Sequence, residues 1–576
     1  METRTKLIWA VLAVAGIAVA CSPTANRGAG PAGGGAGLNG GESALGSYLA
    51  GRSARFGRDT AAAADYFDLA LEEDPENQTL LQRTFMLMLE EGRMARAVEL
   101  AELRTQTNPR AVMAQMVLAI DDIRDGRLDV GERRLDQPQR TGFAVLLRPL
   151  LLAWLAAGKD DVETAMASLD GLSDRAAFAA FKSYHSALIY DYLDRPAEAE
   201  AAYIETRGGG AANATRVVLA YGSFLHRQDR ADEARTLFED YLTRVPENPV
   251  IEAALADIEA GRGVNPPVQT VEQGIAEAFY GAAGALARDR AGNAAKVYVQ
   301  LALYMRPDLD SGHMLLGEIF ENDERWAEAI AVYKAIPRSS AYSWDSRLRT
   351  ATSLNRLDRV DEAVELLRSM VDERPADTGA PIALADILRT HERYEEATVE
   401  YDRAIARTGD LQERHWALLY TRGIARERSS DWDLAEADFL RALELRPDQP
   451  LVLNYLGYSW VERAKNLDEA RRMIEKAVEQ RPNDGYIVDS LGWVLFRMGE
   501  FDAAVRHLER AVELRPEDPT INEHLGDAYW QVGRRLEARF QWRHALALDP
   551  DEAQIPVIKN KLDEGLQPVT PVGSDS

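Results

Sequence analysis

The chain has 576 residues, of which 46% are hydrophobic and 28% charged, and its 67 basic and 93 acidic residues give a formal net charge of −26. This composition is too apolar for a disordered chain and too polar for a protein with many membrane spans. A single cysteine excludes a disulfide framework and a cysteine-rich zinc site, and the acidic balance argues against nucleic acid as a partner, because phosphate binding needs a basic face.

Residues 1–20 have the pattern of a secretory signal. Arg4 and Lys6 precede an uncharged, mostly apolar run over residues 7–20, which is shorter than the roughly 20 residues that span a bilayer as a helix. The run ends in small residues directly before Cys21, the only cysteine. This arrangement resembles the lipobox of bacterial lipoproteins, which implies lipidation of Cys21; an ordinary secreted signal with a chance cysteine is the alternative. Ser22 follows in place of aspartate, and the same resemblance then implies sorting to the outer membrane.

Residues 21–43 are rich in glycine and include the run GAGPAGGGAGLNGG. Because glycine has high backbone entropy and no side chain to bury, we predict a flexible tether. A phosphate-binding loop is excluded, since no Lys-Ser/Thr pair follows the glycines and no strand precedes them.

A repeat of about 34 residues organises the remaining chain, and a fixed period in this range predicts a solenoid of stacked helix pairs. Prolines 34 or 35 residues apart mark the ends of successive units: Pro75 and Pro109, then Pro447, Pro482, Pro516 and Pro550. Weaker units cover 44–77, 78–111 and 215–248, others begin near 276, 310, 344 and 378, and residues 112–210 are helical by pattern but match poorly.

The units at 485–518 and 519–552 show the repeat most clearly. Their shared positions are Leu491-Gly492, Gly499, Ala504, Ala511 and Pro516 in the first, and Leu525-Gly526, Gly533, Ala538, Ala545 and Pro550 in the second. Small residues let the paired helices approach closely and let the next pair dock, while glycine and proline end the helices. The pattern resembles the tetratricopeptide repeat (TPR), which implies an all-α, right-handed superhelical solenoid of about fourteen helix pairs.

The period breaks over residues 258–274, which contain Gly261, Gly263, Pro266 and Pro267. We predict a seam there, between an N-terminal array over 44–257 and a C-terminal array over 275–552. Within the last segment, 553–576, the stretch from Ile555 to Leu566 predicts an amphipathic capping helix, which the end of a solenoid needs; we expect the final ten residues to be disordered.

No motif for catalysis, metal binding or cofactor binding is present. No two of the eight histidines are four residues apart, and none lies in an HExxH motif. The nucleophile elbow Gly-x-Ser-x-Gly and the P-loop are also absent. We therefore predict a protein that is not an enzyme and has no cofactor, metal site or small-molecule substrate.

Aromatic residues gather in the C-terminal repeats, where eight of the ten tryptophans lie at or after position 326. In TPR arrays the first helix of each pair lines the concave groove, and this resemblance places a set of aromatic and polar side chains there. The predicted groove residues are Tyr420, Asn454, Tyr455, Tyr458, Asp489, Trp493, Phe496, Arg497, Glu523, Asp527 and Trp530. Aromatics flanked by polar side chains are typical of protein-binding hot spots. The alternative is that several of them pack between helices, as we expect for Trp542 on a second helix.

The predicted groove has no set of Lys and Arg side chains like the one with which chaperone-binding TPR proteins capture a C-terminal carboxylate. This argues against such a ligand.

A lipoprotein-like start before a long repeat array, with the runs NYLGY at 454–458, DSLGW at 489–493 and HLGDAYW at 524–530, resembles a family of Gram-negative outer-membrane TPR lipoproteins. The resemblance implies a non-enzymatic adaptor on the periplasmic face, which binds and activates a carboxyl-terminal processing protease and presents substrates such as cell-wall hydrolases. The lipid anchor would be its only membrane contact, since a chain at −26 is repelled by anionic lipid and attracts basic partners. A scaffold of a secretion, pilus or exopolysaccharide apparatus, and an enzyme with an unrecognised site, are the alternatives.

Overall fold

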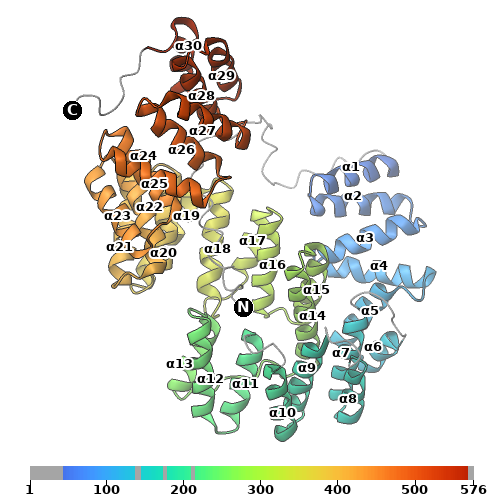
Figure 1. Cartoon of the computed structure of the whole chain (residues 1–576). Helices are drawn as coiled ribbons and strands as arrows, with labels where there is room; N and C mark the ends of the chain where they lie inside the picture. The colour runs from blue at the N-terminus through green and yellow to red at the C-terminus, as the bar shows by residue number, and fades with distance from the viewer. Residues whose placement is uncertain (1–42, 137–143, 173–177, 209–213, 568–576) are drawn as a thin grey trace. The chain divides into compact units, whose positions relative to one another are not determined.

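The computed structural model describes residues 43–136, 144–172, 178–208 and 214–567. Over these residues the regular secondary structure is entirely helical, with thirty α-helices (Figure 1). The predicted signal peptide, Cys21, nearly all of the predicted tether and the last nine residues lie outside the described ranges.

The chain divides into two compact units, and the division falls between Ala363 and Val364. We call the described residues 43–363 the N-terminal unit and the described residues 364–567 the C-terminal unit. The N-terminal unit contains α1 (Ala44–Phe56), α2 (Thr60–Glu73), α3 (Gln78–Glu90), α4 (Met94–Thr107), α5 (Val112–Arg124), α6 (Leu128–Leu135), α7 (Ala144–Ala157), α8 (Val162–Asp170), α9 (Ala179–Tyr192), α10 (Pro196–Thr206), α11 (Thr215–Arg227), α12 (Ala231–Arg244), α13 (Pro249–Glu259), α14 (Val271–Arg288), α15 (Gly292–Met305), α16 (Asp310–Asn322), α17 (Trp326–Lys334) and α18 (Ser343–Arg356).

The next helix, α19 (Val360–Glu373), contains the division. The C-terminal unit continues with α20 (Gly379–Thr390), α21 (Tyr394–Thr408), α22 (Trp416–Arg428), α23 (Trp432–Leu445), α24 (Pro450–Glu462), α25 (Leu467–Gln480), α26 (Gly485–Arg497), α27 (Phe501–Leu514), α28 (Pro519–Gln531), α29 (Arg535–Ala547) and α30 (Gln554–Glu564). In the described chain α13 and α30 are single, and the other helices follow one another as fourteen pairs. The predicted all-α solenoid of about fourteen helix pairs is therefore confirmed.

Glycine and alanine set the spacing within each pair. An added Cβ at Gly492 of α26 would lie 2.6 Å from Leu508 of α27, and one at Gly526 of α28 would lie 2.5 Å from the indole of Trp542. Ala504 is fully buried at the same interface as Leu508. Only residues without a larger side chain let these helices approach so closely.

The turn inside a pair follows from a backbone conformation that favours glycine. Gly499 between α26 and α27 has φ +82°, and the amide of Glu500 donates to the carbonyl of Leu495 at 2.8 Å. This closing bond satisfies a carbonyl at the end of the first helix, as in a Schellman motif. The glycine predicted at the middle of this repeat therefore ends α26.

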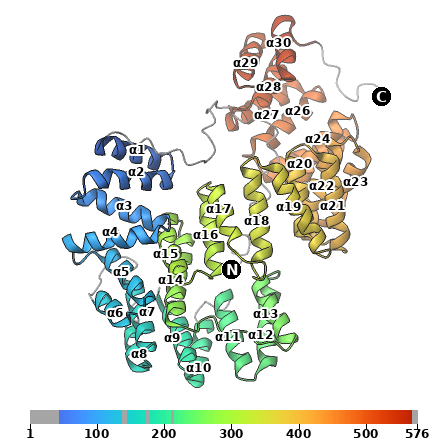
Figure 2. The ribbon, with the colours of Figure 1, turned by 180° about the vertical axis from the view of Figure 1, so that it is seen from behind.

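Within the N-terminal unit the chain folds back on itself after α13. Residues 260–270 form the irregular connection to α14 and include a carbonyl, that of Val264, which accepts a hydrogen bond from Ser223 at 2.9 Å. Helix α14 then packs against α7 and α9, and α15 packs against α3 and α5, as both ribbon views show (Figures 1 and 2). The break predicted at 258–274 contains this connection; its division of the repeats into two arrays stays a prediction.

Candidate protein-binding surface

The eleven residues predicted for the groove all lie on the first helices of four successive pairs in the C-terminal unit. Burial separates them into two groups. Six are buried: Tyr420, Asn454, Asp489, Phe496, Glu523 and Asp527. Five are only half-buried, and we call them the aromatic row: Tyr455 and Tyr458 on α24, Trp493 and Arg497 on α26, and Trp530 on α28. The aromatic row is the part of the predicted site that a partner can reach.

Trp493 is held at the centre of the aromatic row by contacts with three helices. Its ring stacks on His524 of α28 with ring centroids 4.1 Å apart and on Phe496 with centroids 4.9 Å apart. Its Nε1 donates to Oε1 of Glu462 on α24 at 2.8 Å, and Arg497 donates to the same oxygen at 2.6 Å. Trp493 thus packs between helices and is also only half-buried; its contact with a partner stays a prediction.

A buried ion pair lies beneath this tryptophan. His524 Nδ1 is 3.0 Å from Oδ1 of Asp489, and both side chains are about nine-tenths buried. Burial lowers the pKa of His524, but the carboxylate of Asp489 outweighs it and raises the pKa above the usual histidine value. The predicted set contains Asp489 but not His524 and Glu462, although these two occupy the same repeat positions as Tyr455 and Arg497, which it does contain.

Tyr420 and Tyr455 form the other end of the predicted site. Their rings meet edge to face with centroids 5.9 Å apart, and Tyr455 also packs on Phe439 at 5.2 Å. Among the described residues, the buried Tyr420 Oη and Asn454 Oδ1 have no hydrogen-bond partner.

The chain's own C-terminal helix contacts the last part of the predicted site. Lys561 of α30 lies 2.7 Å from both Glu523 and Asp527, and Trp542 donates to the other oxygen of Asp527 at 2.9 Å. An added Cβ at Gly565, just after α30, would overlap the ring of Trp530. Glu523 and Asp527 are thus engaged within the chain, and Trp530 is flanked by it. Trp542 is fully buried, as predicted.

Four first helices of the N-terminal unit, α3, α5, α7 and α9, are covered by later helices of the same chain. Tyr304 of α15 donates to Asp121 of α5 at 2.6 Å, and Arg325, next to α17, donates to both oxygens of Glu91, beside α3, at 2.7 and 2.8 Å. These contacts join residues more than 180 positions apart. They accompany the packing of α14 and α15 on α3, α5, α7 and α9.

A buried polar cluster reinforces that packing. Glu277 of α14 forms a bidentate ion pair with Arg216 of α11, and it also accepts a hydrogen bond from Tyr184 of α9 at 3.2 Å. Burial raises the pKa of Glu277, but Arg216 outweighs it and holds the net pKa below the usual value. The glutamate therefore stays charged and links three helices.

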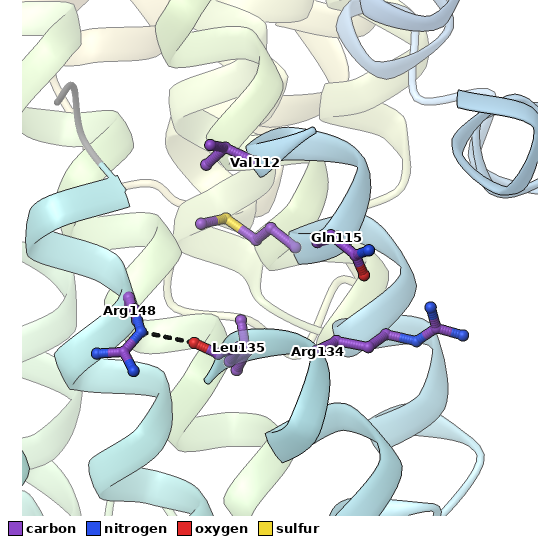
Figure 3. Close-up of a pocket in the computed structure, with 6 residues that line it drawn as sticks. Val112, Gln115, Arg134, Leu135 and Arg148 are labelled. Atoms are coloured by element: carbon purple, nitrogen blue, oxygen red, sulfur yellow. Dashed lines mark hydrogen bonds between the residues drawn. The ribbon is translucent and has the colours of Figure 1, made fainter. Parts of the chain in front are cut away.

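Two hollows in the described chain lack the form of an enclosed substrate site. One, of about 10 Å³, lies among Val112, Gln115, Met116, Arg134, Leu135 and Arg148 (Figure 3); Arg148 closes it by donating to the carbonyl of Leu135 at 2.5 Å. That volume admits about one water molecule. The other is an open depression of about 540 Å³ beside the turn at Gly499.

The described residues contain no group of three or more His, Cys, Asp or Glu side chains that could hold a metal ion. In the same part of the chain no helix is long and apolar enough to cross a membrane.

Comparison with known proteins finds repeat families and curated relatives. Tetratricopeptide-repeat profiles match residues 184–249 and 420–485, and a TPR-repeat profile matches 492–533. TPR repeat-containing protein PA4667 of Pseudomonas aeruginosa is 30% identical over 195 residues, which are 33% of this chain and 32% of that protein. The match thus spans about a third of the relative's length.

Solved structures with a similar arrangement of helices include the Cut9–Hcn1 hetero-tetramer of APC/C, with 14% identity, a TM-score of 0.38 and coverage of 90% of this chain and 96% of that one. Another is YrrB, described as a TPR protein with an unusual peptide-binding site, with 21% identity, a TM-score of 0.27 and coverage of 34% and 99%. The chain therefore contains tetratricopeptide repeats in both units, at residues 184–249, 420–485 and 492–533.

Proposed function

We propose that this protein is a non-enzymatic adaptor that docks a protein partner on the aromatic row of the C-terminal unit. The observation that carries the proposal is the fixed, half-exposed setting of Trp493, which is stacked on His524 and hydrogen-bonded to Glu462. A rigid aromatic side chain loses little conformational entropy on binding, and such residues dominate protein-binding hot spots.

The N-terminal unit supports the choice of the C-terminal unit as the docking site. TPR proteins commonly bind ligands along their first helices, yet α14 and α15 pack against four of these helices in the N-terminal unit. A partner would have to displace the Glu277–Arg216 ion pair and its buried surroundings to reach them. The aromatic row needs no such displacement.

The remaining parts of the proposal rest on the sequence. The lipobox-like residues before Cys21 support a lipid anchor in the outer membrane, with the repeats in the periplasm. The resemblance to outer-membrane TPR lipoproteins supports a carboxyl-terminal processing protease as one partner and cell-wall hydrolases as its substrates. Holding both on one chain would raise their effective concentration to the millimolar range of linked sites.

Reconstitution tests the adaptor role. The purified chain is mixed with the carboxyl-terminal processing protease and a cell-wall hydrolase of its own bacterium, and hydrolase cleavage is followed by gel densitometry. We expect cleavage at least tenfold faster than with protease alone, and a loss of this gain with Trp493→Ala. No complex on size exclusion and no acceleration would contradict the protease assignment, and hydrolysis by the chain alone would show an enzyme.

The anchor needs a separate test. We expect metabolic labelling with a radioactive fatty acid to mark the wild-type chain and not Cys21→Ser, and the wild-type chain to sediment with outer membranes. Label on the variant, or wild-type protein in the soluble periplasmic fraction, would contradict the anchor without affecting the aromatic row.

A further inference from the structure

The outer face of α29, the second helix of the last pair, exposes two large apolar side chains. Leu536 is 82% exposed and Phe540 is 64% exposed, more than any other large hydrophobic residue of the described C-terminal unit. They are four residues apart and so lie on one face of the helix. The ring of His544, a further turn along, stacks parallel to Phe540 with centroids 6.3 Å apart.

The preceding pairs show that the fold does not require apolar residues at these positions. Counted from the shared buried alanine of each second helix, the position of Leu536 holds Asp433 in α23, Asp468 in α25 and Asp502 in α27. The position of Phe540 holds Ala437, Arg472 and Arg506. All six of these residues are exposed. Among the second helices of the last four pairs, only α29 therefore has large apolar residues at these two positions.

The same helix carries arginines that have no carboxylate partner among the described residues. Arg534 pairs with Glu509 and Glu537, whereas Arg535, Arg539 and Arg543 form no ion pair with any described residue. Arg535 and Arg539 instead lie over the ring of Trp530, 5.2 and 5.4 Å from its centroid. In a chain with a net charge of −26, α29 is therefore a local basic surface.

We propose that Leu536, Phe540, Arg535, Arg539 and Arg543 form a second docking surface, which binds an acidic segment of a protein partner that also carries apolar side chains. The three guanidinium groups call for carboxylates, because bidentate pairing with a carboxylate is their strongest hydrogen bond. Leu536 and Phe540 supply the apolar contacts that would anchor such a segment.

A protein fits this surface better than a lipid membrane does. The net charge of −26 opposes approach to an anionic bilayer as a whole, while arginine and aromatic side chains around an apolar centre are the composition of protein interfaces. The surface goes beyond the function proposed above, because it would take a ligand of its own on a second helix. It adjoins the aromatic row, since Arg535 and Arg539 lie over Trp530.

The variant Leu536→Asp/Phe540→Arg tests this surface cleanly. It gives α29 the two residues that α27 has at the same positions, so that the fold should persist, and it leaves the net charge unchanged. Asp502→Ala/Arg506→Ala, at the equivalent positions of α27, is the matched control. Thermal unfolding followed by circular dichroism verifies that both variants fold like the wild type.

The probe is a phage library of random 16-residue peptides, panned on the full wild-type chain and counter-screened on the two variants. We expect clones that the wild type and the α27 control retain and the α29 variant loses, with at least two Asp or Glu residues beside apolar ones. A synthetic peptide from such a clone should bind the α29 variant at least tenfold more weakly by fluorescence anisotropy, and should also bind Arg543→Glu more weakly.

Other results would overturn the proposal. They are the absence of clones that discriminate the variants, and discriminating clones without acidic residues. Sedimentation with phosphatidylglycerol vesicles that depends on Leu536 and Phe540 would assign the surface to a membrane, and a wild-type dimer in light scattering that the variant lacks would assign it to a second copy. None of these outcomes touches the aromatic row, which Trp493→Ala tests separately.

Discussion

Two buried histidines, His185 and His524, have opposite charge states because their surroundings differ. Trp154 donates its Nε1 hydrogen to Nδ1 of His185 at 3.0 Å, so this nitrogen must be unprotonated. Burial lowers the pKa of His185 to about 4, although Glu277 nearby opposes the shift. His524 has the opposite fate because Asp489 outweighs burial and raises its pKa. The first histidine is neutral at physiological pH, and the second is stabilised as a cation.

The neutral state of His185 predicts a specific acid sensitivity. The unfolded chain binds a proton at an ordinary pKa near 6.5, and the folded chain only near 4. The contribution of the neutral His185 to the free energy of unfolding is thus fully present above about pH 6.5. It is lost as the pH falls toward 4, by up to roughly 3 kcal/mol. His185→Gln keeps an acceptor for Trp154 but does not titrate. We expect its melting temperature to fall less than that of the wild type between pH 7 and 4.5 in scanning calorimetry; equal falls would contradict this account.

At the residue scale, helical register predicted which side chains share a face but not which of them stay accessible. Asp489 and Phe496 occupy positions expected to face the groove, yet both are buried. One is covered because His524 pairs with it, and the other because Trp493 stacks on it. The two neighbours lie on different helices, Trp493 on α26 and His524 on α28, and their positions depend on tertiary packing that no repeat period records.

Helix α14 offers a test of close packing with an internal control. An added Cβ at Gly274 would overlap the indole of Trp154, which is fully buried in α7. An added Cβ at Gly284 would have Arg288 as its nearest neighbour, at 3.8 Å. Gly284→Ala should stabilise the protein by up to about 1 kcal/mol through helix propensity. Gly274→Ala should destabilise it by about 1–3 kcal/mol through overpacking. Urea unfolding would measure both changes, and equal signs would contradict the packing of α14 on α7.

Helix α30 provides a second test of how single helices are held, because its Lys561 is the cation between two buried carboxylates. Removing one partner of a buried ion pair typically costs about 3–5 kcal/mol, since the remaining charge is left uncompensated. Lys561→Met should therefore increase hydrogen exchange at the amides of α28 and leave those of α22 unchanged. Lys559→Met, at an exposed position of the same helix, serves as the control. Unchanged protection of α28 in Lys561→Met would show that α30 does not hold the last pair.

At the scale of elements, the sequence predicted the helix pairs because their signals are local. The small residues at Gly492, Gly526 and Ala504, and the turn glycine Gly499, act within one 34-residue unit. The return of α14 and α15 onto α3, α5, α7 and α9 is not local. It depends on contacts such as that between Tyr304 and Asp121, 183 residues apart, which leave no periodic trace in the sequence.

For the whole molecule, the two units use the same repeat differently. In the N-terminal unit the chain's own α14 and α15 pack on four of the first helices, and the buried ion pair of Glu277 with Arg216 joins α14 to α11. In the C-terminal unit the first helices keep a half-exposed row of aromatic side chains. The repeat pattern alone gives both units the same expected groove, and the aromatic residues of the C-terminal repeats already favour that unit in the sequence. The structure adds that α14 and α15 cover four first helices of the N-terminal unit.

The most direct test is the affinity of the full chain for its protease partner, measured for the wild type and for two single tryptophan variants. Trp493→Ala removes the centre of the aromatic row. Trp326→Ala is the control, because Trp326 is also half-buried and lies 5.7 Å from an arginine, Arg356, but belongs to the N-terminal unit. We expect Trp493→Ala to raise the Kd in isothermal titration calorimetry at least tenfold and Trp326→Ala to leave it within twofold of the wild type. An unchanged Kd with a folded Trp493→Ala protein would contradict the central claim.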